Sequence, residues 1–191
     1  MNYLAHILLS GKDPQIQVGN FIADAVKGSA YKDYPADIRK GILLHRAIDD
    51  FTDHHPAVKE AVGLLRGTFG RYSGVLVDMY FDYFLAIHFR DYSEKSLRCF
   101  AYRFYWTAVI HYRYLPERFQ GFLWHFITTD RLRQYANPRG IYRSLELMAR
   151  YKNLRVSPDE AVGFMLEHRT ELERLFAVFF PELQELCKSK L

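Results

Sequence analysis

Residues 36–52 carry the helical pattern that most constrains how this chain can fold. Pro35 suits the first turn of a helix, and apolar side chains then recur at a spacing close to 3.6 residues. His45 and Asp49 are four residues apart, so both lie on the face that also carries Ile42. An ionisable side chain that faces a core must be paired, hydrogen-bonded or bound to a metal. The pattern therefore predicts a helix with a polar site on its buried face.

The rest of the chain also reads as a series of helices. No stretch alternates at period two for long enough to require a sheet. We expect helices over 2–10, 15–28, 36–52, 56–66, 75–90, 94–112, 116–128 and 139–151, and a last helix after Ser157 that is interrupted before Pro181. With 191 residues and no low-complexity linker, the chain is predicted to be one all-α domain over residues 1–191, a bundle of about seven to nine helices.

Four further ionisable side chains stand in apolar surroundings. His6 lies within an apolar first helix, Asp24 follows the apolar residues 21–23, and Asp78 and Asp82 are four apart on the most apolar helix. Two carboxylates on one buried face repel each other and lose solvation together. A divalent cation resolves this conflict, and imidazoles with carboxylates suit Mn, Fe or Zn, and Mg less well. We therefore expect a metal site, of the kind that acidifies water and holds a phosphate.

Each of these residues also has an ordinary structural interpretation. His6 could be a hydrogen-bonded core histidine, Asp24 could cap a turn, and the aspartates of 75–90 could pair with Arg46 or Arg71. Taken singly these interpretations are the simpler ones. Taken together, several ionisable groups at core positions favour a site.

The residues after position 52 divide between structure and chemistry. Asp53 is expected to be the N-cap of the helix that Pro56 opens, which leaves His54 and His55 beyond the end of the preceding helix. On this interpretation both histidines are exposed.

Composition limits the partners and the compartment. The formal charge of +4 favours an acidic partner, either a protein or a nucleic acid. Residues 103–126 interleave aromatic side chains with Arg and His, but their helical spacing favours an aromatic core over a nucleic-acid surface. Cys99 and Cys187 have no zinc or redox-motif spacing, and no stretch fits a signal peptide or a membrane span. We expect a cytoplasmic protein without a membrane partner.

Four blocks in the first 90 residues resemble the acyl carrier protein phosphodiesterase family and occur in the family's order. They are Met1-Asn-Tyr-Leu-Ala-His6, Gly19-Asn-Phe-Ile-Ala-Asp24-Ala-Val-Lys-Gly28, Gly41-Ile-Leu-Leu-His45-Arg46-Ala-Ile-Asp49 with Phe51-Thr-Asp53-x-His55-Pro56, and Gly70-Arg71-Tyr-Ser-Gly-Val-Leu-Val-Asp78-x-x-Phe-Asp82-x-Phe-Leu. The second half of the chain is similar to the family only in length, helicity and aromatic content.

The resemblance implies a metal-dependent phosphodiesterase of fatty acid metabolism, usually supported by Mn²⁺. Such an enzyme hydrolyses the bond between 4′-phosphopantetheine and a serine of holo-acyl carrier protein. The family is regarded as a distant relative of the all-helical HD-type metal phosphohydrolases, which implies an HD-like fold. This chain contains no His-Asp dipeptide, so ligand roles cannot be copied from the HD pattern.

The blocks and the core pattern together select the candidate site. The catalytic and metal-binding core is expected to consist of Asp24, His45, Asp49 and Asp78. Further candidates, as ligands or as groups that orient them, are His6, Asp82 and His55. Candidates for binding the substrate phosphate are Arg46 and Arg71, since a guanidinium matches phosphate oxygens.

The implied partner is holo-acyl carrier protein, a small acidic helical protein that a basic face would attract. Two other functions stay open. An HD-type phosphohydrolase acting on a nucleotide or another small phosphodiester would use the same metal set. A non-catalytic module that binds acyl carrier protein or RNA would use the Asp and His residues in structural ion pairs.

Overall fold

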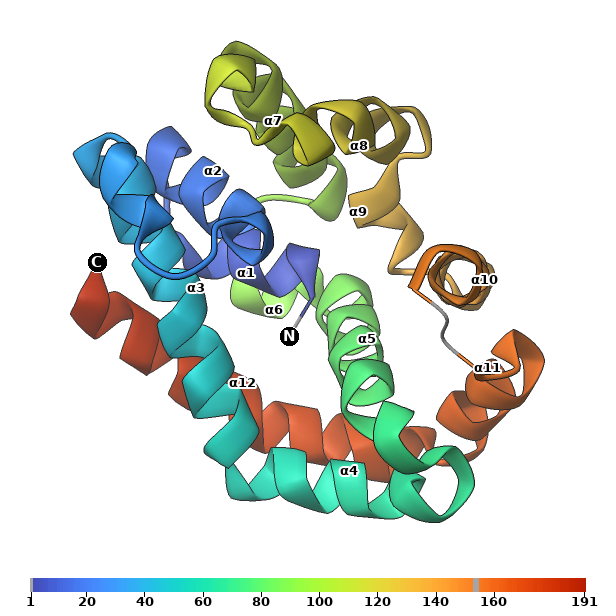
Figure 1. Cartoon of the computed structure of the whole chain (residues 1–191). Helices are drawn as coiled ribbons and strands as arrows, with labels where there is room; N and C mark the ends of the chain where they lie inside the picture. The colour runs from blue at the N-terminus through green and yellow to red at the C-terminus, as the bar shows by residue number, and fades with distance from the viewer. Residues whose placement is uncertain (1, 153–154) are drawn as a thin grey trace.

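The computed structural model describes residues 2–152 and 155–191, and every regular element in these ranges is helical (Figure 1). The α-helices are α1 (Tyr3–Leu9), α2 (Pro14–Ile22), α3 (Ala36–His54), α4 (Pro56–Phe69), α5 (Ser73–Ile87), α6 (Phe89–Tyr92), α7 (Leu97–Ile110), α8 (Glu117–Thr128), α9 (Arg131–Gln134), α10 (Pro138–Lys152), α11 (Pro158–Glu167) and α12 (Arg169–Lys190). Short 3₁₀ turns are η1 (Ala23–Ala25), η2 (Ala30–Asp33), η3 (Gly70–Tyr72) and η4 (Tyr112–Tyr114). The prediction of an all-α fold is confirmed; Met1, which begins the first family-like block, lies outside the described residues.

Helices α2 and α3 approach so closely that glycine is required at their crossing. A Cβ atom added to Gly19 would lie 2.0 Å from the carbonyl oxygen of Ile38, and one added to Gly41 would lie 2.1 Å from that of Ile16. Both neighbours are backbone atoms, so no rotamer change could relieve the clash. The two glycines thus bring the backbone of α2 against the face of α3 that carries the predicted site.

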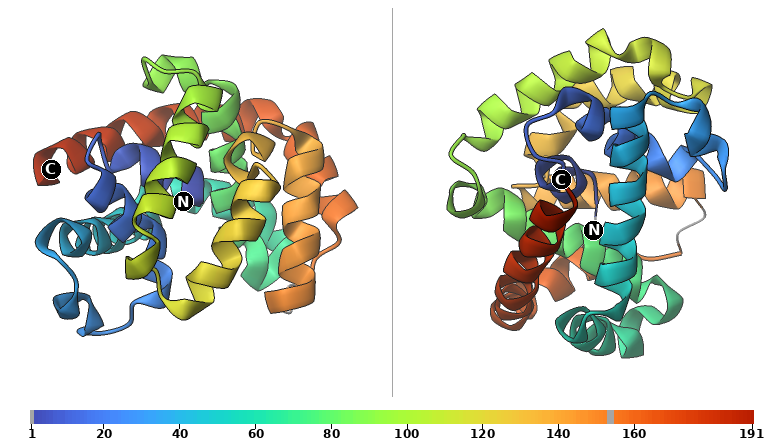
Figure 2. Two further views of the ribbon diagram at one scale, coloured as in Figure 1. Left: turned by 90° about the horizontal axis from the view of Figure 1, so that it is seen from above. Right: turned by 90° about the vertical axis from the view of Figure 1, so that its left-hand side faces the viewer.

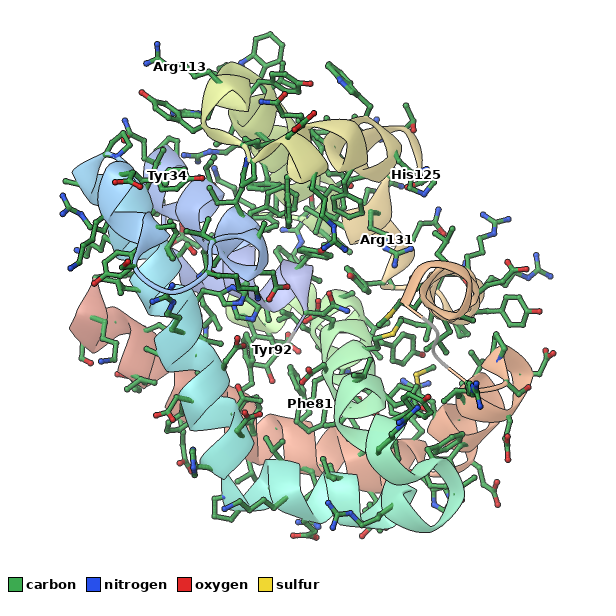
Figure 3. All side chains as sticks on the ribbon, viewed as in Figure 1. Tyr34, Phe81, Tyr92, Arg113, His125 and Arg131 are labelled. Atoms are coloured by element: carbon green, nitrogen blue, oxygen red, sulfur yellow. The ribbon has the colours of Figure 1, made fainter. Side chains whose placement is uncertain are left out.

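Helix α5 runs through the middle of the molecule, between α1 and the outer helices α10 and α11 (Figure 1). Phe81, labelled in Figure 3, is fully buried and packs against Phe176 of α12. Asp82 is also fully buried, and its carboxylate accepts hydrogen bonds from the backbone N–H groups of Leu4 at 2.9 Å, Asn2 at 3.3 Å and Ala5 at 3.4 Å. These bonds satisfy N–H groups that the first turn of α1 leaves unpaired. Helix α5 thereby fixes the start of α1.

Helices α7 and α8 form an outer layer, which faces the viewer in Figure 2 (left). Their inner faces meet α2 through aromatic contacts. The ring of Phe21 lies 5.2 Å, centroid to centroid, from the rings of Phe104, Phe119 and Phe126. Such tilted and edge-on contacts stabilise aromatic cores, so the expected aromatic core over 103–126 is present on this side of the layer.

Two helix ends in the first half differ from the prediction. The helix expected over 15–28 stops at Ile22, and Gly28 adopts a positive φ of 55° in the following loop. The prediction that Asp53 caps the next helix was wrong, because α3 continues through His54 and the cap is His55. The Nδ1 atom of His55 accepts the N–H of Ala57 at 3.2 Å. Since Pro takes the first helical position, the residue before it is extended and becomes the cap.

The C-terminal helix was also predicted differently. The interruption lies at His168, between the end of α11 and the start of α12. Pro181, where the interruption was expected, lies inside α12 and does not end it. Over the described ranges the structure has twelve α-helices, of which α6 and α9 are single turns. The buried apolar side chains of these helices form one continuous cluster. In the same ranges, no helix is both long and apolar enough to span a bilayer.

Candidate active site

A polar cavity of about 270 Å³ opens where α1, α2, α3 and α5 meet. Its walls are formed by Asn2, Tyr3, His6, Asn20, Asp24, His45, Asp49, Thr52, Asp53 and Asp78. All four residues predicted as the core of the site are in this set, together with His6. The fold has therefore gathered ionisable side chains that are up to 72 positions apart in the sequence.

Two histidines form the floor of the cavity. The rings of His6 and His45 are stacked, with their centroids 4.0 Å apart and their planes 19° from parallel. Both donate from Nδ1 to the side-chain oxygen of Asn20, at 2.9 Å for His6 and 3.0 Å for His45. The amide nitrogen of Asn20 donates to Ser10 at 2.9 Å, which turns its oxygen toward the two rings. Asn20 thus sets the orientation of both imidazoles.

This orientation directs the other ring nitrogen of each histidine toward one carboxylate. Nε2 of His6 is 3.3 Å from Oδ1 of Asp49, and Nε2 of His45 is 3.1 Å from Oδ2 of the same residue. Nδ1 of His6 carries the ring proton, so Nε2 has only a lone pair. This lone pair faces a carboxylate oxygen of Asp49, and a carboxylate oxygen cannot donate a hydrogen bond. Nε2 of His6 is buried and has no hydrogen-bond partner. A cation between these atoms would satisfy them, and so the geometry calls for one.

The electrostatics of the pocket also favour a positive charge. Burial tends to lower the pKa of His45, but its hydrogen bonds with Asp24 and Asp49 outweigh burial and raise the pKa to about 9. Burial, reinforced by repulsion from His45, lowers the pKa of His6 to about 4, so that ring is neutral at pH 7. Burial tends to raise the pKa of Asp49, but the two histidines hold it well below its usual range. The hydrogen bond from His45 also lowers the pKa of Asp24.

The donor atoms are close enough to share one metal ion. Ligand atoms of His6, His45 and Asp49 all lie within 4.8 Å of one another. Asp24, on η1, has its Oδ1 3.6 Å from Nε2 of His45, and Asp78, on α5, lines the same cavity. Two imidazoles with one to three carboxylates are a donor set suited to Mn, Fe or Zn. The buried Nε2 of His6 and this donor set both fit a divalent cation.

Two of the further predicted ligands have other partners. Asp82 lies beneath the first turn of α1 and bonds to its backbone rather than lining the cavity. Burial raises the pKa of Asp82 to about 7, against the opposing effect of these N–H donors. The Nε2 atom of His55 is 3.2 Å from Glu182 of α12, and its ring packs on Phe179. The structure brings neither residue to the histidine pair.

The two predicted phosphate-binding arginines also lie away from the cavity walls. Arg46 donates to the carbonyl oxygens of Val26 at 3.1 Å and Gly28 at 2.9 Å, and so holds the loop after η1. Arg71 is exposed and donates to the hydroxyl of Tyr72 at 2.7 Å.

Asn20 is the residue of the candidate site that the sequence prediction missed. It lies in the second family-like block, but a neutral amide does not raise the burial conflict that drew attention to the Asp and His residues. Its signal in the sequence was its position within the apolar stretch 16–22. Asp53 was assigned to a cap but lines the cavity instead, because α3 extends past it.

The all-helical framework buries paired imidazoles against a carboxylate, with more carboxylates around the same cavity, and this donor set fits a metal-dependent hydrolase. The family model described as acyl carrier protein phosphodiesterase matches residues 1–183. The chain therefore belongs to the acyl carrier protein phosphodiesterase family, a family of phosphoric diester hydrolases, and the prediction of the family is confirmed.

Relatives match over the full length of the chain. Proteins named acyl carrier protein phosphodiesterase from Photorhabdus laumondii and Yersinia pestis are each 30% identical to it, over 96% and 99% of their own lengths. The protein of that name from Enterobacter sp. strain 638 is 31% identical over 99% of its length. In all three cases the whole of this chain is covered. No solved structure matches the chain, so an HD-like fold stays a prediction.

Proposed function

We propose that this chain hydrolyses the phosphodiester that joins 4′-phosphopantetheine to a serine of holo-acyl carrier protein, in a reaction that depends on a divalent metal. The names of its relatives support the substrate. The observation that carries the metal dependence is the pair of stacked histidines whose Nε2 atoms converge on Asp49. Mn²⁺ is the expected ion, and Mg²⁺, Fe²⁺ and Zn²⁺ are the alternatives.

His6, His45 and Asp49 would hold the metal, and Asp24 and Asp78 would complete the ligand set or accept a proton. When bound, such an ion neutralises phosphate charge and lowers the pKa of water. The chain's own contribution is orientation, because Asn20 keeps both imidazole Nε2 atoms directed at Asp49.

The reaction itself is a displacement at phosphorus. A water molecule attacks the phosphorus atom while the bond to the serine oxygen breaks. Asp24, on η1, and Asp78, on α5, both line the cavity, and either carboxylate would accept the proton that the water loses. The serine oxygen takes up a proton as it leaves, so the products are apo-acyl carrier protein and 4′-phosphopantetheine.

Intact-mass analysis of holo-acyl carrier protein tests this proposal directly. Incubation with the protein and Mn²⁺ is expected to reduce the carrier's mass by that of the prosthetic group, and a chelator is expected to prevent the loss. A panel of nucleotides and bis-p-nitrophenyl phosphate serves as the comparison. If the holo mass persists while members of this panel are hydrolysed, the protein is a phosphohydrolase with a different substrate. If neither substrate changes with any of the four metals, the protein is not this enzyme.

A further inference from the structure

The outer face of α7 exposes a row of large apolar side chains. Tyr102, Trp106 and Ile110 recur every four residues and are 49%, 68% and 59% exposed. We refer to these three residues as the α7 stripe. The opposite face of the same helix is well packed, with Phe104 fully buried, so the exposure is not a result of loose packing. Exposed apolar side chains that are contiguous indicate an interaction surface.

A second exposed tryptophan extends this surface onto the neighbouring helix. Trp124 of α8 is 52% exposed, and its ring lies 6.1 Å from that of Tyr112, which follows the end of α7. Trp106 and Trp124 are the only tryptophans in the chain. Both therefore lie on the outer α7–α8 layer seen in Figure 2 (left).

The same region carries the positive charge of the whole protein. Residues 97–134 contain six arginines, no lysine and two acidic residues, a formal charge of +4. The remainder of the chain has twenty basic and twenty acidic residues, so the net charge of +4 belongs to α7, α8 and α9. One of the two acids, Asp130, is already paired with Arg133 at 2.7 Å. The surface is thus complementary to an acidic partner.

Arginines stand at both ends of the α7 stripe. Arg98 is one helical turn before Tyr102, and its guanidinium lies 5.9 Å from the centre of that ring. Arg113 follows the stripe and stacks on the ring of Tyr114 at 4.6 Å. Figure 3 shows Arg113 at the outer edge of the molecule. Both arginines are exposed, and each is held near an aromatic ring in a position to meet a carboxylate.

The residue types favour a protein partner over a lipid surface. Trp, Tyr and Arg are enriched in protein interfaces and in their energetic centres, whereas Lys is depleted there. Helices that bind membranes use lysine as readily as arginine. Nine lysines occur elsewhere in the chain, yet none occurs in residues 97–134.

The surface is also connected to the candidate active site. Tyr3, which lines the cavity, contacts Phe122 and Phe126 on the inner face of α8, at 5.7 and 5.3 Å between ring centroids. Burial raises the pKa of Tyr3 to about 12, against the opposing charges of Arg131 and Arg118. Helix α8 therefore separates this part of the cavity wall from the outer surface of the α7–α8 layer.

We infer that the α7 stripe, together with Arg98 and Arg113, is the docking surface for an acidic helical protein. Its identification as acyl carrier protein rests on the proposed function. The apolar stripe supplies the buried centre of the interface, and the arginines set the orientation of the acidic partner on it.

Intrinsic fluorescence tests this inference without any hydrolysis. Apo-acyl carrier protein has no phosphodiester to cleave. Of the two tryptophans, Trp106 lies on the proposed surface and Trp124 lies on the neighbouring helix α8. Titration is expected to shift the tryptophan emission to shorter wavelength and to saturate, and binding is expected to weaken as salt is added. Isothermal titration then gives the Kd of each variant, and circular dichroism shows whether each variant is folded.

Four variants separate the surface from the rest of the molecule. Trp106→Ala is expected to raise the Kd about 30-fold, and the double variant R98E/R113E about 10-fold with a weaker salt dependence. The controls are Val178→Ala, which removes a side chain that is 49% exposed on α12, and Lys59→Glu on α4. Both control sites are expected to leave the Kd unchanged.

Several results would overturn the inference. One is no binding by the wild type, and another is an equal Kd in Trp106→Ala and Val178→Ala. A blue shift produced by phosphatidylcholine–phosphatidylglycerol vesicles but not by the carrier would assign the surface to lipid. A dimer in sedimentation that Trp106→Ala dissociates would assign it to a second copy of the chain. If the carrier binds this surface but the holo mass persists with Mn²⁺, the proposed function fails and the docking surface stands.

Discussion

The cavity and the α7 stripe depart from ordinary burial in opposite directions. In the cavity, His6 and His45 are ionisable yet buried, whereas on the surface Trp106 and Ile110 are apolar yet exposed. A buried ionisable group costs stability unless it is paired or bound, and a cluster of exposed apolar groups marks an interaction surface. The two regions are therefore the parts of the molecule where folding alone does not account for the residues.

The two regions differ in how their groups are fixed. In the cavity the Nδ1 atom of each imidazole is held by the side-chain oxygen of Asn20, which serves both rings. On the surface, the arginines stack on neighbouring rings and face solvent. Low-dielectric surroundings strengthen the interactions of the cavity, while water and salt weaken those of the surface. Single substitutions should therefore have much larger effects in the cavity.

Asp49→Asn should have the largest effect. The substitution keeps the shape of the side chain but removes the charge on which both histidines converge, so we expect kcat/KM to fall at least about 1,000-fold. The measurement is the rate of loss of the holo mass with Mn²⁺. Asp50→Asn is the matched control, since Asp50 is adjacent and exposed and its carboxylate lies 3.4 Å from His54. Similar rates for the two variants would show that Asp49 has no special role.

Asn20 tests whether the orientation of the histidines matters. Asn20→Leu removes the acceptor for both Nδ1–H groups, and we expect Mn²⁺ to bind about 10- to 100-fold more weakly. Asn20→Asp keeps that acceptor, and its affinity for Mn²⁺ should be close to that of the wild type. Isothermal titration with Mn²⁺ gives the affinities, and thermal melting reports folding. An Asp variant as weak as the Leu variant would contradict this role.

The sequence allowed the ionisable half of the site to be predicted. His45, Asp49, Asp24 and Asp78 were identified because charged residues in apolar stripes conflict with burial, and that conflict is visible without a structure. Asn20 produces no such conflict, since a buried amide is common and its role depends on two rings that come from α1 and α3. Its position against α3 follows from Gly19 and Gly41, whose close approach no spacing rule reveals.

Asp78 and Asp82 show a second limit of prediction. They share one face of α5, and periodicity therefore treats them alike, but four residues along a helix move a side chain by about 6 Å. Asp78 lines the cavity, while Asp82 lies beneath the first turn of α1. Which neighbour meets each carboxylate depends on packing between elements distant in sequence. The fold class was easier to predict, because proline, glycine and apolar spacing mark most helices locally.

The pH dependence of metal binding is the next smaller effect. His45 must lose a proton to act as a ligand, and its pKa in the metal-free protein is raised to about 9. Below pH 9 protons compete with the metal, so the affinity for Mn²⁺ should rise about 10-fold per pH unit between pH 7 and 8.5. Titrations at several pH values, in buffers with different ionisation enthalpies, would also count the released proton. An affinity independent of pH would show that His45 is not a ligand.

Asp82→Asn should affect activity least, because Asp82 serves the start of α1 and not the cavity. We expect kcat/KM to change by less than about 3-fold, which is far below the effect of losing a metal ligand.

The effect of Asp82→Asn on stability should depend on pH. The folded pKa is raised to about 7 from an ordinary value of 3.8, so the folded state binds more protons between these values. The contribution of Asp82 to the free energy of unfolding of the wild type should therefore fall as pH rises from about 4 to 7 and then level off. The Asp82→Asn variant lacks this titration. Urea unfolding should therefore show that the stability advantage of the wild type over the variant narrows or reverses as pH rises from about 4 to 7. Other titrating groups, including His45, contribute equally to both proteins and cancel in the difference. Parallel curves would show that the pKa of Asp82 is not raised in the folded protein, and a loss of Mn²⁺ affinity in Asp82→Asn would return this residue to the metal site.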